Sequence, residues 1–280
     1  MDTLAQVGTT VGQVDEILKA EEQAHVTQPV SFDDHRIEVQ NVSFGYHNDQ
    51  EILHQVNLSI PQNSMTALVG PSGSGKSTLA KLVAGFWDVK NGRITMGGHD
   101  LTEIPLEELY DQIAYVSQDN YLFDDTVREN IRMGRRDATD AEVEAAAHAA
   151  GCDSFISELE HGYETNVGGG GASLSGGEKQ RISIARAMLK NAPIVILNEA
   201  TANVDPENEA VIQQAVAKLV AHKTVIVIAH RLKTVRHADQ ILVIDHGRIV
   251  QQGKHAQLIS QPGIYADFVG GKKQSTSWKL

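Results

Sequence analysis

Short apolar runs alternate along the chain with longer segments in which apolar residues recur at helical spacing. The apolar runs are rich in aliphatic and β-branched residues and predict buried strands at residues 65–69, 113–117, 194–197, 224–228 and 240–245. Helical spacing predicts helices at residues 78–85, 126–132, 140–150, 179–189 and 206–219, the third with Asp140 as its N-cap. Strands that alternate with helices predict an α/β fold on a mainly parallel sheet, with the ligand site at the carboxyl ends of the strands.

Smaller units flank this alternating region. Residues 36–46 and 53–60 have strand-like patterns and predict a small β-rich piece before the strand at 65–69, and residues 92–96 predict another strand. Residues 4–22 predict an amphipathic helix, which could simply dock on the domain itself, and the polar residues 23–34 predict a linker. We expect a short disordered tail at residues 271–280.

The composition indicates one large domain with appendages in a reducing compartment. The chain has 280 residues, a formal net charge of −12 and no long run of Lys or Arg, which argues against a nucleic-acid partner. Cys152 is the single cysteine, so no internal disulfide can form, and the histidines lack zinc-type spacing. No apolar run approaches the roughly 18 residues of a membrane span, and Met1-Asp2-Thr3 does not begin a signal peptide. We expect any membrane link to come from another segment or chain.

The strongest motif is a complete phosphate-binding loop, the Walker A motif, between a predicted strand and a predicted helix. Its residues are Gly70, Pro71, Ser72, Gly73, Ser74, Gly75, Lys76 and Ser77. The glycines lack a Cβ, so successive N–H groups can converge on a phosphate at the positive end of the following helix. Lys76 adds a positive charge, and Ser77 offers a hydroxyl to Mg²⁺. A glycine-rich turn before an ordinary helix is the alternative, but the full motif in its full context favours binding of a nucleoside triphosphate.

A second candidate anion site opens the helix predicted at residues 179–189. Leu174, Ser175, Gly176, Gly177 and Glu178 follow the glycine run at residues 168–171. A helix N-terminus of this kind presents N–H groups to an anion. A serine-capped helix after a glycine loop is also a common structural feature, so this pentapeptide alone is less specific.

Polar residues stand at the ends of several predicted strands, where the ligand of a parallel sheet binds. Gln118, Asn198, Glu199 and His230 all occupy such positions. A lone Gln118 or His230 is more often structural, but convergence with Gly70 at one rim favours a functional site.

Tyr46 precedes the phosphate loop by 24 residues. An exposed aromatic ring beside the loop could stack on an adenine, although a lone tyrosine is more often a surface or core residue.

In this order, the motifs resemble those of the nucleotide-binding domain of ABC transporters. The resemblance covers residues 31–270 and rests on Tyr46, the Walker A loop, Gln118, LSGGE at 174–178, ILNEA at 196–200, Asp205 and His230. It implies a P-loop NTPase (RecA-like) core with a mainly parallel sheet, an antiparallel β subdomain and a helical signature-bearing subdomain at about residues 119–190. Residues 11–22, 115–130 and 200–209 look similar to exporter-type half-transporters, which implies that residues 1–30 lead in from a missing transmembrane domain.

The resemblance also implies site roles. It implies a head-to-tail dimer of identical or different cassettes, with two ATP molecules between the Walker A loop of one subunit and the signature of the other. The implied catalytic residues are Lys76, Gln118, Glu199 and His230. Among them, Glu199 is implied to polarise the attacking water. The implied nucleotide contacts are Tyr46, residues 70–77, Thr78, Ser175, Gly176, Gly177, Glu178 and Asp205. The implied Mg²⁺ ligands are Ser77, Gln118 and Asn198.

Two positions depart from the family pattern. Asn198 stands where the family normally has an aspartate, so the acceptor oxygen remains but the negative charge is lost. We expect weaker Mg²⁺ binding and slower hydrolysis with ATP binding retained, unless the other ligands suffice. Gly169 stands where exporters often carry a glutamate. The loss of that side chain either affects coupling to transmembrane domains or is harmless loop variation.

Three functions therefore remain open. The first is the ATP-hydrolysing motor domain of an ABC exporter at the cytoplasmic face of the cell membrane, working with transmembrane domains. The second is a clamp that dimerises on ATP with little turnover, which Asn198 favours. The third is a soluble ABC-type ATPase, which the lack of a coiled-coil insertion, a second cassette and a basic surface disfavours.

Overall fold

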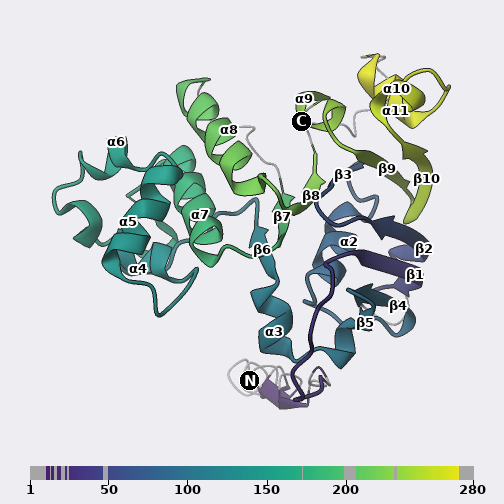
Figure 1. Ribbon diagram of the computed structural model, residues 1–280, viewed down its shortest axis with the longest axis horizontal. Helices are drawn as coiled ribbons and strands as arrows, with labels where there is room; N and C mark the ends of the chain where they lie inside the picture. The colour runs from purple at the N-terminus through teal and green to yellow at the C-terminus, as the bar shows by residue number, and fades with distance from the viewer. Residues whose placement is uncertain are drawn as a thin grey trace, which may run out of the picture.

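Two β-sheets and a group of helices make up the computed structural model (Figure 1). The structure describes residues 11, 12, 14, 15, 18, 19, 23, 25–46, 50–171, 173–198, 206–229 and 232–270. Within those residues, no helix has the length and apolar character that crossing a membrane requires. The predicted helix at residues 4–22 lies largely outside them, and the predicted tail at residues 271–280 lies entirely outside them.

The central sheet has six strands in the order β10-β9-β3-β8-β7-β6. Its strands are β3 (Met65–Val69), β6 (Ile113–Val116), β7 (Ile194–Asn198), β8 (Thr224–Ile228), β9 (Gln240–Asp245) and β10 (Arg248–Gly253). All neighbours pair in parallel except β10, which pairs antiparallel with β9. The predicted parallel sheet is confirmed, and β10 is an addition that the sequence analysis did not predict.

The parallel strands β3, β6, β7, β8 and β9 are largely buried on both faces, which explains their apolar runs. Along β3, Ala67 and Val69 face one hydrophobic core while Leu68 faces the other. Successive side chains of a strand point to opposite faces, so a strand covered on both sides has few positions for a polar residue. The candidate site residues Gln118 and Asn198 accordingly stand at or just beyond the ends of strands.

The second sheet is antiparallel, with four strands in the order β2-β1-β4-β5. They are β1 (Ile37–Phe44), β2 (Leu53–Ile60), β4 (Asn91–Met96) and β5 (His99–Asp100). Buried residues of β1, β2 and β4 share one hydrophobic core with helix α2 (Lys76–Val83) and with one face of the central sheet. The predicted antiparallel β subdomain is therefore confirmed, and α2 lies between it and the central sheet.

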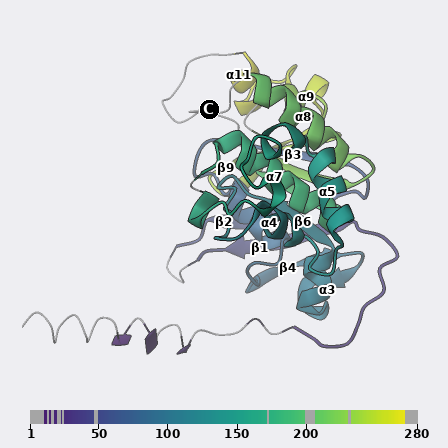
Figure 2. The ribbon, with the colours of Figure 1, turned by 90° about the vertical axis from the view of Figure 1, so that its left-hand side faces the viewer.

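Helices on the other side of the central sheet share the second hydrophobic core (Figure 1). They are α4 (Val127–Arg132), α5 (Asp140–Ala149), α6 (Asp153–Ile156), α7 (Gly176–Lys190) and α8 (Pro206–Val220). Figure 2 looks onto this side and shows α4, α5 and α7 in front of the sheet. One predicted cap is wrong: Thr139 caps α5, because its hydroxyl accepts the Glu142 N–H, and Asp140 is the first helical residue. Threonine and aspartate both cap well, so composition alone could not decide between neighbours.

The remaining elements are short and escaped the pattern analysis. They are α3 (Leu106–Asp111), α9 (Leu232–Arg236), α10 (His255–Leu258), α11 (Ile264–Val269) and the 3₁₀ turns η1 (Leu101–Glu103), η2 (Gly162–Glu164) and η3 (Gly169–Gly171). Segments of one or two turns contain too few residues to show a helical period.

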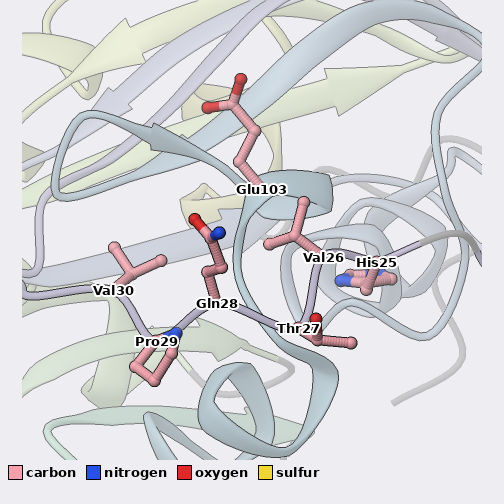
Figure 3. A pocket seen from close by; sticks show the side chains of 7 residues that line it. All are labelled: His25, Val26, Thr27, Gln28, Pro29, Val30 and Glu103. Carbon is pink, nitrogen blue, oxygen red and sulfur yellow. The ribbon is translucent and has the colours of Figure 1, made fainter.

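Gln23 and residues 25–35 form a strap along the α2–α3 side of the domain. Its Gln23 side chain donates to the Gly85 carbonyl (3.2 Å), and His25 Nδ1–H donates to the Ile104 carbonyl (2.7 Å). Further along, the Val30 N–H donates to Glu108 Oε2 (3.0 Å). Residues 25–30 and Glu103 line an open hollow of ≈ 520 Å³. Figure 3 shows the side chains of these residues. The predicted linker therefore has defined anchor points on the domain.

A buried polar clamp fixes the loop that follows β6. Asn130 is fully buried, and its side chain exchanges hydrogen bonds with both the N–H (2.9 Å) and the carbonyl (3.0 Å) of Phe123. Arg186 of α7 donates to the carbonyl of Tyr121 (2.7 Å) and to both oxygens of Asn130. Burial lowers the pKa of Arg186 to about 10. These bonds tie the loop after β6 to helices α4 and α7.

We expect Asn130→Ala to lower the free energy of unfolding by about 2 to 3 kcal/mol, because it removes a fully buried amide whose bonds to the Phe123 N–H, the Phe123 carbonyl and Arg186 are then lost. Urea unfolding monitored by circular dichroism measures the change. Asn91→Ala, at an exposed strand residue, is the matched control and should cost less than about 0.5 kcal/mol. Equal stability losses for the two variants would contradict this account of the clamp.

Candidate functional site

The loop between β3 and α2 has the curled backbone that the sequence predicts. Gly70 has φ 150°, and a Cβ there would lie 1.9 Å from the Ile244 carbonyl oxygen. Gly75 has φ 104°, and its Cβ would meet the Leu53 side chain at 2.6 Å. Both positions exclude any side chain, so the glycines are required by packing as well as by backbone conformation.

Lys76 lies inside this loop rather than in solvent. Its ammonium donates to the carbonyls of Gly70 (2.8 Å) and Pro71 (2.7 Å), and the residue is 7% exposed. Burial lowers the pKa of Lys76 to about 8. No carboxylate of the described residues forms an ion pair with it, so the loop holds a buried cation whose charge is met only by dipoles. Such a site attracts an anion.

Three predicted site residues stand at the same edge of the central sheet. β3 runs into Gly70, β6 leads to Gln118, and β7 ends at Asn198. Because β3, β8, β7 and β6 are parallel neighbours, their carboxyl ends lie along one edge. The predicted residues Glu199, Asp205 and His230 lie outside the described residues.

Asn198 presents a polar atom that the described protein does not satisfy. Its Oδ1 is buried and has no hydrogen-bond partner among the described residues. An unpaired buried carbonyl oxygen is costly unless a ligand or water binds it.

The predicted Mg²⁺ ligands fit that ion by donor type. Ser77 and Gln118 are exposed and offer hydroxyl and amide oxygens, and Asn198 adds its unpaired Oδ1. Oxygen donors are what Mg²⁺ prefers. None of the three carries a negative charge.

Tyr46 lies at the end of β1, beside the start of α2. Its hydroxyl donates to Thr78 Oγ1 (3.4 Å), one residue beyond Ser77. Its ring makes edge contacts with Phe44 (centroids 5.2 Å apart) and Trp87 (5.4 Å). The residue is 37% exposed, so the ring is held in place yet accessible. The contact with Trp87 was not predicted; the signal in the sequence is the aromatic pair Phe86-Trp87 directly after helix α2.

The signature pentapeptide forms the N-terminus of α7. Ser175 is its N-cap: its hydroxyl accepts the Glu178 N–H (3.4 Å), and the Ser175 N–H donates to the Glu178 carboxylate (2.7 Å). Glu178 therefore has a structural role in this capping box. Ser175 and Gly176 are exposed, which leaves N–H groups at this helix end available to an anion.

The two candidate phosphate-binding helix ends belong to different parts of the fold. Buried residues of α2 pack in the core shared with the antiparallel sheet, whereas those of α7 pack in the core on the opposite face of the central sheet. Figure 1 shows the two helices well separated.

Gly169 is not required by the backbone. A Cβ there meets nothing within 4 Å, whereas Gly171 has φ 68° and its Cβ would lie 2.9 Å from the Leu122 side chain. The fold therefore accommodates a glutamate at position 169 and not at position 171.

The buried charge of Lys76 predicts a pH dependence of stability. Its pKa of about 8 in the folded chain lies below the ordinary value of 10.5, so the unfolded chain binds more protons between these pH values. Burying the charged Lys76 ammonium destabilises the folded chain fully below about pH 8. This destabilisation disappears as the pH rises from about 8 to 10.5, because the folded chain releases the proton first. We expect the wild type to gain stability relative to Lys76→Met between about pH 8 and pH 10.5, in urea unfolding at several pH values.

A constant difference between the two chains across that window would contradict the buried cation. With inorganic tripolyphosphate bound, the anion should raise the Lys76 pKa and move the window to higher pH.

Comparisons with known proteins agree with this geometry. Residues 53–202 match the family described as "ABC transporter". A Staphylococcus aureus protein (strain NCTC 8325 / PS 47), whose name describes a multidrug export ATP-binding/permease protein, is 48% identical over 239 residues, or 85% of this chain and 41% of that protein. ATP-binding cassette sub-family B member 6 of Mus musculus is 48% identical over 239 residues, or 85% of this chain and 28% of its own.

A solved structure of a bacterial Atm1-family ABC exporter with ATP bound has the same fold, with a TM-score of 0.86 and 39% identity. The match covers 98% of this chain and 48% of that one. The chain thus spans less than half the length of these relatives. The fold is the P-loop ATPase fold of ABC proteins, and the family match alone covers more than half of the sequence. The chain belongs to the ABC transporter family.

Proposed function

We propose that the chain is the ATP-binding and ATP-hydrolysing motor domain of an ABC exporter. The observation that carries this proposal is the buried ammonium of Lys76, which pairs with no carboxylate among the described residues, inside a loop that ends at the N-terminus of α2. A polyphosphate supplies the charge that this ammonium lacks. The family membership and the similarity to exporters support the transport role.

ATP binds along α2 and its preceding loop. Backbone N–H groups of residues 72–77 and the Lys76 ammonium hold the β- and γ-phosphates, while Thr78 lies one residue further along the helix. The Tyr46 ring stacks on the adenine, which its exposed and anchored position supports.

Two chains, or this chain and a different cassette, form a head-to-tail dimer. The separation of α2 and α7 within one chain supports this arrangement, because the N-terminus of α7 can then meet the γ-phosphate bound to another subunit. Ser175, Gly176 and Gly177 make that contact, and Asp205 bridges the subunits.

Hydrolysis is a phosphoryl transfer, in which catalysis is mostly positioning and charge stabilisation. Glu199 polarises the attacking water, His230 holds the γ-phosphate and the base, and Gln118 aligns them. Lys76 stabilises negative charge that develops on the phosphate oxygens. When bound by Ser77, Gln118 and Asn198, Mg²⁺ supplies further charge neutralisation at the phosphates.

Asn198 slows this reaction. The unpaired Oδ1 supports a role as a ligand, but an amide lacks the carboxylate charge that a hard cation favours. ATP binding depends on the loop and on Tyr46 and is retained.

The remaining partners are transmembrane domains, which would place the motor at the cytoplasmic face of the cell membrane. The length of the relatives supports this, since this chain matches less than half of each. A second candidate function is a clamp that closes on ATP with little turnover, and the neutral residue at position 198 favours it.

We expect Asn198→Asp to raise ATPase turnover about tenfold and to lower the Mg²⁺ concentration for half-maximal activity, because a carboxylate replaces the neutral ligand. Steady-state phosphate release with Mg²⁺ titrated measures both effects. Glu199→Gln is the control and should abolish turnover while leaving ATP binding intact. Equal turnover of the parent and Asn198→Asp would refute this account of Asn198, and high turnover in the parent would exclude the clamp.

The head-to-tail dimer predicts complementation between two inactive chains. Lys76→Ala removes the phosphate lysine, and Gly176→Asp adds a repelling carboxylate at an exposed position where a Cβ meets nothing within 4 Å. An equimolar mixture should recover about a quarter of wild-type activity, because half of the dimers are mixed and each has one intact site. Gly176→Ala should stay active. If the mixture stays inactive while each variant still dimerises, the loop and the signature do not act across subunits.

A further inference from the structure

Trp87 is a large aromatic residue in an unusual setting. It is 49% exposed, and its ring contacts Tyr46 edge-on, with centroids 5.4 Å apart and an interplanar angle of 77°. No part of the function proposed above uses it. Its recorded ring contact is with Tyr46, the residue proposed to stack on adenine.

The backbone at Trp87 is fixed to the helix that carries the phosphate loop. α2 ends in a Schellman motif: the Gly85 N–H donates to the Leu82 carbonyl (3.0 Å), and the Phe86 N–H donates to the Lys81 carbonyl (3.0 Å). Gly85 has φ 73°, as this motif requires. Trp87 thus leaves α2 in a fixed direction, while the N-terminus of the same helix holds the loop at residues 70–77.

Tyr46, in contrast, reaches this helix from β1. Its hydroxyl meets Thr78 Oγ1 near the start of α2, and its ring meets Trp87 after the end of α2. Phe44 contributes a second edge contact, at 86° to the Tyr46 ring. The Tyr46 hydroxyl is thus held by the first turn of α2, and its ring is held by the segment that follows α2. These two contacts fix the ring relative to the phosphate loop.

We propose that Trp87 is a positioning residue for adenine recognition, which holds the Tyr46 ring in the orientation that stacks on the base. The proposal rests on the proposed function, because it presumes that the chain binds ATP through Tyr46 and the phosphate loop. Without Trp87, the Tyr46 ring gains rotamers that must be given up again when the base binds. Trp87 acts through Tyr46 and makes no contact with the phosphates.

The test compares ATP with inorganic tripolyphosphate, which has no base. Calorimetric titration of the 280-residue chain gives the Kd of each ligand. We expect Trp87→Ala to weaken ATP binding about three- to tenfold, as for the loss of an edge-to-face aromatic pair, and to leave tripolyphosphate binding unchanged. Trp87→Phe, which keeps a ring, should restore most of the ATP affinity.

Phe86→Ala is the matched control. Phe86 is the neighbouring residue, is 41% exposed and contacts Tyr115 (5.2 Å) and Tyr110 (6.5 Å) instead of Tyr46. Its removal should leave the affinity for both ligands unchanged. In a Tyr46→Ala background, Trp87→Ala should have no further effect on ATP binding, because its influence passes through the tyrosine.

Three results would overturn the positioning role. They are equal losses for ATP and tripolyphosphate, an undiminished Trp87 effect in the Tyr46→Ala background, and unchanged ATP affinity in Trp87→Ala. The second would make Trp87 a direct contact of the base. A wild-type chain that binds neither ligand would instead overturn the proposed function, and this inference with it.

Discussion

The parallel register of β3, β8, β7 and β6 is the constraint on which the candidate site depends. The first residues of these strands are in register: Met65 pairs with Val225, Ile194 with Thr224, and Ile113 with Ile194. The strands therefore also end along one edge of the sheet. The burial of both faces leaves few positions for polar side chains within these strands. The candidate site residues stand where the strands stop, and there the sheet brings together segments that are far apart in sequence.

Two polar groups at this edge lack a charged or hydrogen-bonding partner among the described residues. The loop holds a buried ammonium that contacts the Gly70 and Pro71 carbonyls and the Ser74 hydroxyl, and the end of β7 offers the neutral Asn198 Oδ1. An anion with its own cation would satisfy both groups at once.

Helix α2 links the separate parts of the proposed nucleotide site. Its N-terminus extends the phosphate loop, its first turn receives the Tyr46 hydroxyl, and its C-terminal cap directs Trp87 toward the Tyr46 ring. Helix α7 instead belongs to the other core, together with the clamp of Asn130 and Arg186. The two candidate phosphate-binding helix ends of one chain therefore belong to different hydrophobic cores.

The sequence by itself determined the main strands, the phosphate loop and the capped start of α7, because these depend on local patterns: unbroken apolar runs, glycines at fixed spacing and a serine before a helix. It misplaced the cap of α5 by one residue and missed α3, β10 and the short C-terminal helices, which are too brief to show a period. Only the tertiary structure decided that Lys76 is buried, that Asn198 Oδ1 lacks a partner, that Gly169 tolerates a side chain and that Trp87 meets Tyr46. Those properties arise from contacts between residues distant in the chain, and no local pattern encodes them.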